Sequence, residues 1–422
     1  MLGWSHERVI GNRELNHPRF AVLIAAVLLS LLGTAAGCRP PADTEVPASP
    51  TATATADHST PDAATSTGLT YTNIHVASVP WSVHVVTADR TRGSFELHSV
   101  HAGGVALGLG PLSRQLPTLA RSNGTAVAAV NGDFYQRDRA YAGDPRGLQI
   151  LEGELISAPN GGSALWIDAQ RQPQAGPVTS RLEVTWPDGK KAPFGLNCDR
   201  RHDALVLYTA SAGTSTHTTG GREFILERGL DGPENPWLPL SIGATLSARV
   251  RAVRDSGNAP ITPDTLVLSA GPAIARGLDN IQAGAIVRIQ ADSVPSLAGA
   301  RTAIGGGPVL VREGKRQAIR GSGESYETSS MFERHPRSAV GWDRDHFHLV
   351  EVDGRQPGLS MGMTLEELAT WMARLGCQTA LSLDGGGSAT LWYDGRVRNS
   401  PCDGHERPIA NGVVLVRKPS AN

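Results

Sequence analysis

The chain has 422 residues, with 39 Lys and Arg against 40 Asp and Glu, and its formal net charge is −1. This near-neutral charge excludes a surface dedicated to nucleic acid, because such surfaces are strongly basic. Four Cys exclude a disulfide-dense scaffold. The 48 Gly and 28 Pro indicate many turns, and 40% hydrophobic residues are enough for a large strand-rich core.

The N-terminal segment is typical of an exported protein. Arginines precede an apolar run over 20–32, which is too short to span a bilayer and resembles the core of a secretory signal. Small residues then lead to Cys38, as in a bacterial lipobox. We expect residues 1–38 to be a signal peptide and Cys38 to carry a lipid that anchors the protein in the cell envelope. The alternatives are a soluble secreted protein and an uncleaved anchor.

Residues 39–68 are rich in Pro, Ala and Thr and have almost no large apolar side chains, which predicts a disordered tether. The folded domain then covers 69–418, with a candidate all-β subdomain at 170–300. Export places Cys198, Cys377 and Cys402 in an oxidising compartment, where at most one pair can form. Cys198–Cys402 is our candidate pair, because both lie in loops.

The domain is predicted to be mostly strands, which makes it an α+β protein with a large mixed, strand-rich core and few covering helices. Alternating patterns predict hairpins over 81–100 and 338–354, and the apolar run 126–131 predicts a strand buried on both faces. Further strands are expected at 182–186, 204–208, 223–227, 244–253, 265–270, 285–290, 307–311, 378–384, 388–395 and 411–417.

Two helices are expected. The first covers Leu112–Arg121, with Pro117 interrupting it. The second covers Leu365–Leu375, where Thr364 and Glu367 form a capping box and Gly376 ends the helix.

The motif with the strongest chemical signal is LSLDGGGSATL, residues 381–391. An acidic residue, Asp384, ends a buried strand, and three Gly then expose backbone N–H groups that can hold an anion. The binding candidates in this motif are Gly385, Gly386, Gly387, Ser388 and Thr390. The motif is neither a Walker loop nor a nucleophile elbow. A tight hairpin capped by Asp384 is the alternative.

Three other segments supply candidate polar groups. Arg337 in RHPRSAVGWD can grip a phosphate with two parallel hydrogen bonds. A strand-to-helix loop contains Asp353, Arg355, Gln356 and Ser360. The remaining candidates are Asn131 and Asp133 in VNGDFY, and Arg407 near the C-terminus. A surface arginine and ordinary tight turns are the alternatives.

His346 and His348 share one face of a strand and could begin a metal site. The sequence shows neither an HExxH motif nor a third ligand, so the metal stays unknown. We expect no required cofactor, although a structural Ca²⁺ could sit in the Asp-rich loops.

The segments VNGDFY, AIGGGPVLVREG, RHPRSAVGWD, VDGRQPG, SLDGGGSATL and RPIANGVV occur in this order. Together they resemble the phosphodiester glycosidase family over about 69–418, and most closely over 301–416. Ser338, Asp133 and Tyr135 depart from the family's usual residues. The resemblance implies hydrolysis of a carbohydrate phosphodiester at the anomeric C–O bond, giving a free sugar and a phosphomonoester.

This reading assigns Asp384 as nucleophile or general base and Asp353 as a second carboxylate. Arg337 and the Gly385–Ser388 backbone would bind phosphate, and the other candidates would contact phosphate or sugar. Two alternatives remain, a non-catalytic cell-surface module that binds glycans and a metal-dependent phosphodiesterase that cuts the P–O bond.

Overall fold

The computed structural model describes residues 68–418, except 93, 105, 120–122, 139, 230–236 and 320–328. These residues belong to one compact unit, Ala52–Asn422. The predicted signal peptide, lipidation at Cys38 and tether lie outside the described residues, apart from residue 68. Within the described part, no helix has both the length and the apolar character needed to cross a bilayer.

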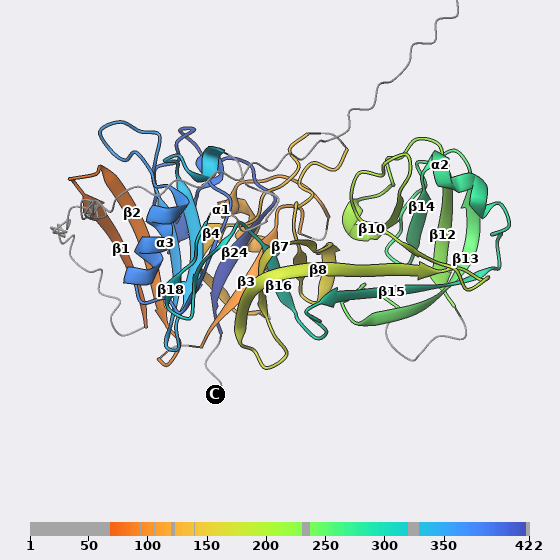
Figure 1. Ribbon diagram of the computed structural model, residues 1–422, viewed down its shortest axis with the longest axis horizontal. Helices are drawn as coiled ribbons and strands as arrows, with labels where there is room; N and C mark the ends of the chain where they lie inside the picture. The colour runs from red at the N-terminus through yellow and green to blue at the C-terminus, as the bar shows by residue number, and fades with distance from the viewer. Residues whose placement is uncertain are drawn as a thin grey trace, which may run out of the picture. The chain divides into compact units, whose positions relative to one another are not determined.

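Three sheets form the described domain (Figure 1). The seven-stranded sheet has the order β1 (Leu69–Val76), β2 (Trp81–Asp89), β20 (His346–Val352), β19 (Arg337–Trp342), β21 (Thr379–Ser382), β17 (Val309–Arg312), β18 (Lys315–Arg316). The five-stranded sheet has the order β23 (Arg396–Val397), β22 (Leu391–Tyr393), β4 (Thr125–Asn131), β24 (Asn411–Arg417), β3 (Phe95–His101).

The twelve-stranded sheet has the order β10 (Gly195–Leu196), β11 (Leu205–Tyr208), β14 (Leu266–Ala270), β12 (Arg222–Arg228), β13 (Ala244–Arg254), β15 (Ile286–Val294), β8 (Pro173–Thr185), β7 (Asn160–Ile167), β16 (Thr302–Gly305), β5 (Gln149–Leu151), β6 (Glu154–Ser157). A further strand, β9 (Lys191–Pro193), pairs with β8. The β10–β11 pair is parallel, and antiparallel pairs make up the rest of the described ladders, so the predicted mixed, strand-rich α+β class is confirmed.

The seven- and five-stranded sheets stack in layers, and two helices cover them. Helix α3 (Leu365–Arg374) packs its buried residues on one face of the seven-stranded sheet. The opposite face of that sheet packs on the five-stranded sheet, through residues such as Val340 and Val130. The outer face of the five-stranded sheet is covered by α1 (Leu112–Gln115). The order of layers is therefore helix, sheet, sheet, helix.

Strand alternation decides which polar side chains enter the layer between these two sheets. In β20, Val350 and Val352 belong to the core under α3, so Glu351 between them points to the opposite face. By the same alternation His84 in β2 and Ser338 in β19 point toward the five-stranded sheet. Buried polar groups thus share a layer that is otherwise apolar.

The predicted hairpin over 81–100 is wrong. Strand β2 pairs with β1 and β20, whereas β3 pairs with β24 in the other sheet. Since β2 already has a neighbour on each side, no edge remains for β3, and the turn between them carries the chain from one sheet to the next. The predicted hairpin across 343–345 is confirmed, because β19 and β20 pair directly.

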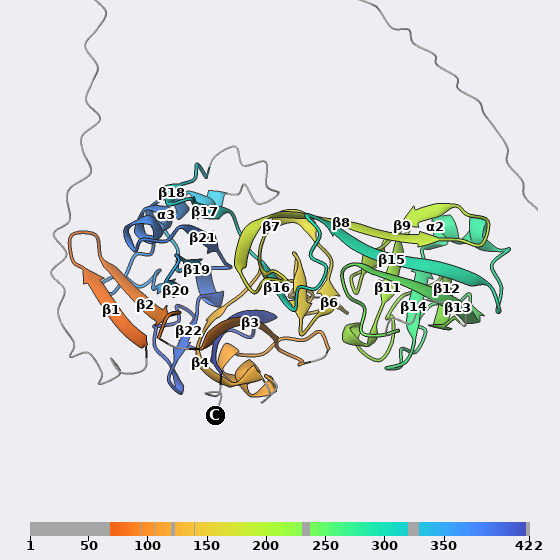
Figure 2. The same ribbon diagram turned by 90° about the horizontal axis from the view of Figure 1, so that it is seen from below.

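In the predicted 170–300 subdomain, strands β8 to β15 all belong to the twelve-stranded sheet (Figure 2). The segment also contains a short α-helix, α2 (Pro272–Ala275). The first half of β8 also pairs with most of β7. The segment therefore shares one continuous sheet with β5–β7 and β16, and its status as a separate subdomain stays a prediction.

The candidate disulfide is also wrong, since Cys198, Cys377 and Cys402 are all free. Cys198 lies in the twelve-stranded region, where its carbonyl accepts a hydrogen bond from the Tyr208 hydroxyl at 2.8 Å. Cys402 lies beside Asp403, whose carboxylate accepts from the Cys402 thiol at 3.6 Å. The location of Cys198 and Cys402 in loops was therefore not enough to predict that they pair.

The stronger helix prediction is confirmed, with the helix ending one residue early. The Thr364 hydroxyl accepts from the Glu367 N–H at 3.1 Å, and the Glu367 carboxylate accepts from the Thr364 N–H at 2.9 Å. The weaker prediction, Leu112–Arg121, is too long. It becomes α1 followed by a 3₁₀ turn at Leu116–Thr118, because Pro117 cannot continue the hydrogen-bond ladder.

Replacing Thr364 by Ala should lower the free energy of unfolding by about 1 kcal/mol, because a helix N–H loses its cap. Denaturant titration of the folded domain measures this. Thr370→Ala on the same helix is the control, since its hydroxyl caps no helix N–H: it donates to the Glu366 carbonyl four residues back and accepts from the Arg316 guanidinium. That variant should stay within about 0.5 kcal/mol of the parent. Equal losses in both variants would contradict the capping argument.

Candidate active site

Several of the predicted motifs meet at one pocket of about 340 Å³. Asp384 and the three Gly of its motif form one wall. Arg337, Arg355 and Arg407 reach the pocket from three separate parts of the sequence. Arg146 and His335 also line it, together with the apolar side chains of Phe134, Met331 and Leu365. One carboxyl group therefore shares a small cavity with four guanidinium groups.

The Asn131 side chain fixes the backbone around Asp384. Its Nδ2 donates to the Asp384 carbonyl at 2.8 Å, and its Oδ1 accepts from the Ser338 hydroxyl at 2.6 Å and the Thr390 N–H at 3.1 Å. The Asp384 N–H donates to the Gly132 carbonyl at 2.9 Å. Asn131 thus joins both sheets to the loop, and neither it nor Thr390 lines the pocket.

The Asp384 carboxyl is partly exposed to the pocket. Desolvation raises its pKa above the ordinary value, while hydrogen bonds from Ser388 and the Gly385 N–H and the charges of Arg407 and Arg146 oppose that rise. The Gly385 N–H donates to Oδ1 at 2.8 Å. The group is therefore a carboxyl held by donors in a partly dry site, an arrangement that suits a nucleophile or general base.

Arg337 is a buried cation whose hydrogen bonds, within the described part of the chain, go to backbone oxygens. Its Nε donates to the Met363 carbonyl at 2.8 Å, and its Nη2 donates to the carbonyls of Ser330 and Glu333 at 2.6 and 2.8 Å. The pKa of Arg337 is lowered to about 10, mainly because the side chain is buried and also because the charge of Arg355 is near. No described carboxylate forms an ion pair with it, so its positive charge is available to an anionic ligand.

Arg355 and Arg407 stand against the glycine loop from two sides. Arg355, exposed and at φ +58°, directs its Nε to His335 Nδ1 at 3.3 Å. Arg407 is held by Asp403 through contacts of 2.7 and 2.9 Å. A Cβ on Gly387 would collide with the Arg407 guanidinium, and Gly386 has φ +61°. The positive φ therefore favours glycine at 386, whereas a side chain at 387 would displace the Arg407 guanidinium.

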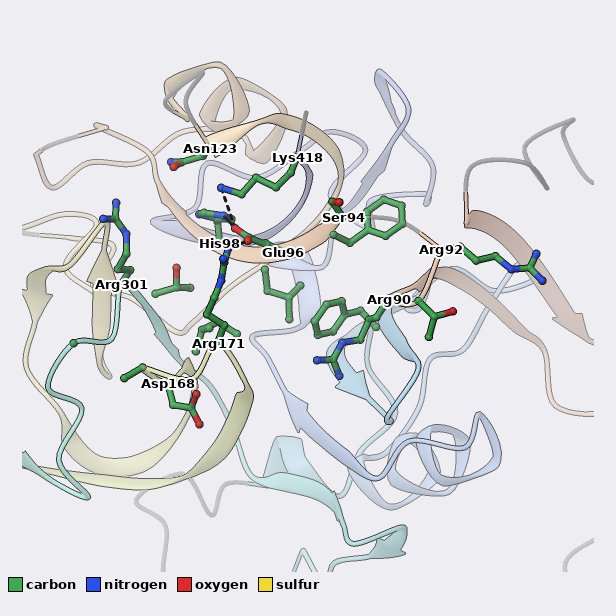
Figure 3. A pocket seen from close by; sticks show the side chains of 18 residues that line it. Arg90, Arg92, Ser94, Glu96, His98, Asn123, Asp168, Arg171, Arg301 and Lys418 are labelled. Carbon is green, nitrogen blue, oxygen red and sulfur yellow. Dashed lines mark hydrogen bonds and ion pairs between the residues drawn. The ribbon is translucent and has the colours of Figure 1, made fainter. Parts of the chain in front are cut away.

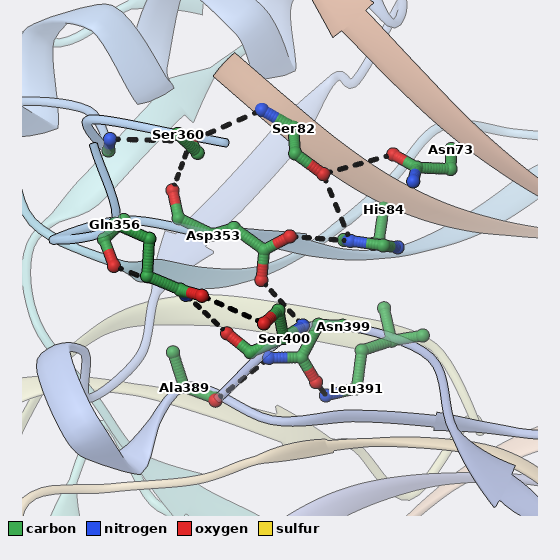
Figure 4. A network of polar contacts seen from close by, with 12 residues as sticks. Asn73, Ser82, His84, Asp353, Gln356, Ser360, Ala389, Leu391, Asn399 and Ser400 are labelled. Carbon is green, nitrogen blue, oxygen red and sulfur yellow. Dashed lines mark hydrogen bonds and ion pairs between the residues drawn. The ribbon is translucent and has the colours of Figure 1, made fainter. Parts of the chain in front are cut away.

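The structure does not bring Asp353 to the pocket, so its prediction as a second carboxylate at the reacting centre is corrected. Asp353 is 1% exposed. Its Oδ1 accepts from the Ser400 N–H at 2.7 Å, and its Oδ2 lies 2.9 Å from His84 Nε2 (Figure 4). Strand alternation explains this, since β20 and its continuation direct odd-numbered side chains into the layer between the sheets.

Gln356 and Ser360 support the same loop rather than line the pocket. Gln356 Nε2 donates to the Ser400 carbonyl at 2.7 Å, and its Oε1 accepts from the Ser400 hydroxyl at 2.8 Å. The Ser360 hydroxyl donates to the Asp353 carbonyl at 2.5 Å (Figure 4). These contacts fix the backbone on which Arg355 stands.

Asp133 lies behind the pocket, 2% exposed. Its carboxyl accepts from the Phe134 N–H at 2.8 Å and from the Gly147 N–H at 2.7 Å. Burial raises its pKa to about 8, against the effect of these two donors, and the nearby Asp384 charge adds to the rise. The predicted contact between Asp133 and substrate is therefore replaced by a structural one, because the side chain is enclosed by backbone.

A larger cavity of about 970 Å³ lies elsewhere and contains none of the predicted site residues (Figure 3). Several of its charged side chains are already held by carboxylates in or beside the cavity. Glu96 contacts Lys418 at 3.1 Å and His98 at 3.3 Å, and Arg301 contacts Glu152 at 2.7 Å. The smaller pocket contains arginines such as Arg337 that form no ion pair with a described carboxylate, and this favours it as the functional site.

Residues 244–416 match the phosphodiester glycosidase family. The resemblance seen in the motifs is thereby confirmed, and the family segment contains Asp384, Arg337, Arg355 and Arg407. Asn131, Phe134 and Arg146 lie before it.

The similar proteins are distant in sequence. The SPbeta prophage-derived uncharacterized protein YomE of Bacillus subtilis (strain 168) is 30% identical over 118 residues, which is 28% of this chain and 18% of that protein. A crystal structure of a hypothetical protein from Synechocystis has 22% identity and a TM-score of 0.66, and covers 83% of this chain and 62% of its own. The chain thus spans less than two thirds of both relatives.

Two further structures are similar. An exported-protein candidate from Burkholderia pseudomallei K96243 has 24% identity and a TM-score of 0.62, covering 82% of this chain and 74% of that one. The zebrafish N-acetylglucosamine-1-phosphodiester alpha-N-acetylglucosaminidase catalytic domain, auto-inhibited by its pro-peptide, has 16% identity and a TM-score of 0.39, with 87% of each chain covered. That last score is too low to support an inference.

Sequence reasoning missed two titratable residues of the pocket. Arg146 stands in an ordinary GDPRG turn, and only its proximity to Asp384 and Asp133 marks it out. His335 lies in the motif that supplied Arg337, so its position two residues before that arginine was the available signal. Glu406, which precedes Arg407 in the sequence, accepts from the Ser113 N–H at 3.0 Å.

The buried Asp133 carboxyl should make stability depend on pH. Its pKa is about 8 in the folded protein and about 4 when unfolded. The folded state therefore holds the extra proton between these values, and stability falls as pH rises from about 4 through 8. We expect the melting temperature to fall between pH 5 and 9.

Asp133→Asn should make that slope shallower, and calorimetry across the pH range measures it. Asp144, whose pKa burial also raises to about 8, should account for part of the remaining slope. The exposed Asp188 provides the control, since Asp188→Asn should leave the slope unchanged. A wild-type melting temperature that rises across this range would contradict the assignment.

Proposed function

We propose that this protein is an exported hydrolase that cleaves the anomeric C–O bond of a sugar-1-phosphodiester, releasing free sugar and a phosphomonoester. The observation that carries the proposal is one carboxylate, Asp384, among four guanidinium groups in a 340 Å³ pocket. The match of 244–416 to the phosphodiester glycosidase family supports it.

The charge arrangement suits a phosphodiester better than an ordinary glycoside. The phosphate carries a negative charge before the reaction and gains more as it leaves the sugar. Arg337, Arg355 and Arg407 can bind these oxygens and stabilise the charge that develops. Because phosphate is a good leaving group, a second carboxyl acting as general acid is less necessary, which is consistent with Asp353 lying outside the pocket.

Asp384 would act at the anomeric carbon. Its carboxylate can attack this carbon or activate a water, and in either role it stabilises an oxocarbenium-like transition state. The N–H of Gly385 and the hydroxyl of Ser388 hold it in place. Phe134, Met331 and Leu365 offer apolar surface to the sugar ring.

We further propose that the protein acts in the cell envelope and is anchored through lipid on Cys38. The apolar N-terminal run and the lipobox-like end support this, and so does the similarity to an exported-protein candidate from Burkholderia. The partners expected are thus a carbohydrate phosphodiester and a membrane, with no nucleic acid.

Hydrolysis of a panel of glycosyl-1-phosphodiesters in ¹⁸O-labelled water tests the reaction directly. C–O cleavage places ¹⁸O in the released sugar and leaves the phosphomonoester unlabelled. P–O cleavage would instead place ¹⁸O in phosphate and release sugar-1-phosphate, as a metal-dependent phosphodiesterase does. Saturable binding of every substrate without any product would show that the pocket only binds glycans.

Asp384→Asn should lower kcat by at least about 10²-fold, because the amide can neither attack carbon nor accept a proton. Circular dichroism and melting temperature check that the variant is folded, and Asp188→Asn is the matched control for loss of one carboxylate. Wild-type turnover by a folded Asp384→Asn protein would refute the catalytic assignment.

Arg355→Ala should lower kcat/KM by about 10- to 100-fold, the effect of one lost hydrogen bond to a charged group. Arg355→Lys should recover only part of this, because the ammonium cannot form two parallel hydrogen bonds. The highly exposed Arg344 serves as control, and Arg344→Ala should match wild type. Initial rates over a substrate range give these values, and equal rates for all three variants would exclude Arg355 from phosphate binding.

A further inference from the structure

A second cluster of ligating groups lies between the seven- and five-stranded sheets, outside the pocket. It consists of His84, Glu351 and Asp353, whose ligand atoms all lie within 4.8 Å of one another. The three residues are 2%, 0% and 1% exposed. They come from two adjacent strands and the residue after one of them, and strand alternation directs them into the same layer.

Contacts from outside the cluster orient two of these side chains (Figure 4). The Tyr71 hydroxyl lies 2.8 Å from His84 Nδ1, which leaves Nε2 facing the cluster. The Ser400 N–H occupies Asp353 Oδ1 at 2.7 Å, which leaves Oδ2 facing Nε2 at 2.9 Å. Metal-binding histidines and carboxylates are commonly held by such outer partners.

Glu351 is the third member, and no described residue forms a hydrogen bond of acceptable geometry with its carboxyl. Both Oε1 and Oε2 are buried without a hydrogen bond of acceptable geometry. The neighbouring Asn399 is already engaged, since its Nδ2 donates to the Ala389 carbonyl and its Oδ1 accepts from the Leu391 N–H (Figure 4). A buried polar group in this state normally binds something else, such as water or an ion.

The charge of the cluster is also unbalanced. Two carboxyl groups lie together, and within the described part of the chain no Lys or Arg forms an ion pair with either of them. The guanidinium of Arg398 lies over the rings of Tyr71 and Tyr393, at 5.1 and 5.0 Å from their centroids. Burying two carboxyl groups beside a single imidazole is costly when both are ionised, so a further cation or a proton must balance their charge.

We propose that His84 Nε2, Asp353 Oδ2 and the Glu351 carboxylate bind a divalent transition-type cation such as Zn²⁺ or Mn²⁺. Two ligands about 2.1 Å from one ion at right angles lie about 3 Å apart, close to the 2.9 Å between Nε2 and Oδ2. The Ser82 hydroxyl, 3.3 Å from Nε2, is a further oxygen donor at the same place. The imidazole ligand favours these ions over Ca²⁺, which takes oxygen ligands.

This site would act on the pocket through the chain rather than through substrate. Glu351 and Asp353 hold the end of β20, and Arg355 follows two residues later. An ion there would fix the strand end from which Arg355 reaches the glycine loop. The cation is therefore assigned a structural role, separate from bond cleavage.

The experiment measures metal content of the full folded domain by plasma mass spectrometry after loading with Zn²⁺ or Mn²⁺ and dialysis. Wild type should retain about one ion per chain. Glu351→Gln keeps the shape but removes the charge, and retention should fall at least tenfold. Co²⁺ loading of wild type should give the visible absorption of a nitrogen- and oxygen-ligated ion, which needs no variant.

His348→Ala is the matched control. Asp343, in the turn before β20, and His346 and His348, in β20, form a second group with ligand atoms within 4.8 Å; the first two are partly exposed and His348 is buried. If the retained ion belongs to that turn, His348→Ala loses it and Glu351→Gln keeps it, and the proposal is overturned. It is equally overturned if loaded wild type holds no ion and shows no change in melting temperature with a chelator, since Glu351 is then neutralised by a proton. These readouts do not depend on turnover.

Discussion

The side chain of Asn131 is the contact on which the architecture of the pocket depends. It ends β4 in one sheet, accepts from Ser338 of the other sheet, and donates to the carbonyl of Asp384. A single buried carboxamide thus sets how the two sheets meet and where the catalytic candidate stands. An amide suits this position because it donates and accepts at once without carrying charge into the layer.

The net charge of −1 and the positive pocket are compatible because the positive charge is local. Arg337 bonds to backbone carbonyls, so its charge is held in place without being cancelled. Arg407 is partly neutralised by Asp403, whereas Arg355 stands exposed on a supported loop. The pocket can therefore attract an anion and still release it, since the deepest cation is fixed and the outer ones can adjust.

The sequence predicted most strands, the capped helix and the pocket motifs, because each depends on local periodicity or on turn residues. It failed where pairing is decided at long range. The 81–100 hairpin failed because β20, more than 250 positions away, takes the edge of β2 that β3 would need. Asp353 was misplaced for a related reason. Its turn signal was read correctly, but the face to which its side chain points depends on how two sheets stack, and this leaves no local mark.

The same stacking explains why polar residues were retained in a layer that could have been wholly apolar. Leu or Val at positions 84 and 351 would pack without desolvation cost, as their neighbours in β2 and β20 do. Polar groups there can instead fix one orientation of the strand end, because their partners must meet at defined distances. In the loop that follows β20, hydrogen bonds of Gln356 and Ser360 hold the backbone that carries Arg355. The position of Arg355 at the pocket therefore depends on a buried hydrogen-bond network that lies outside the pocket.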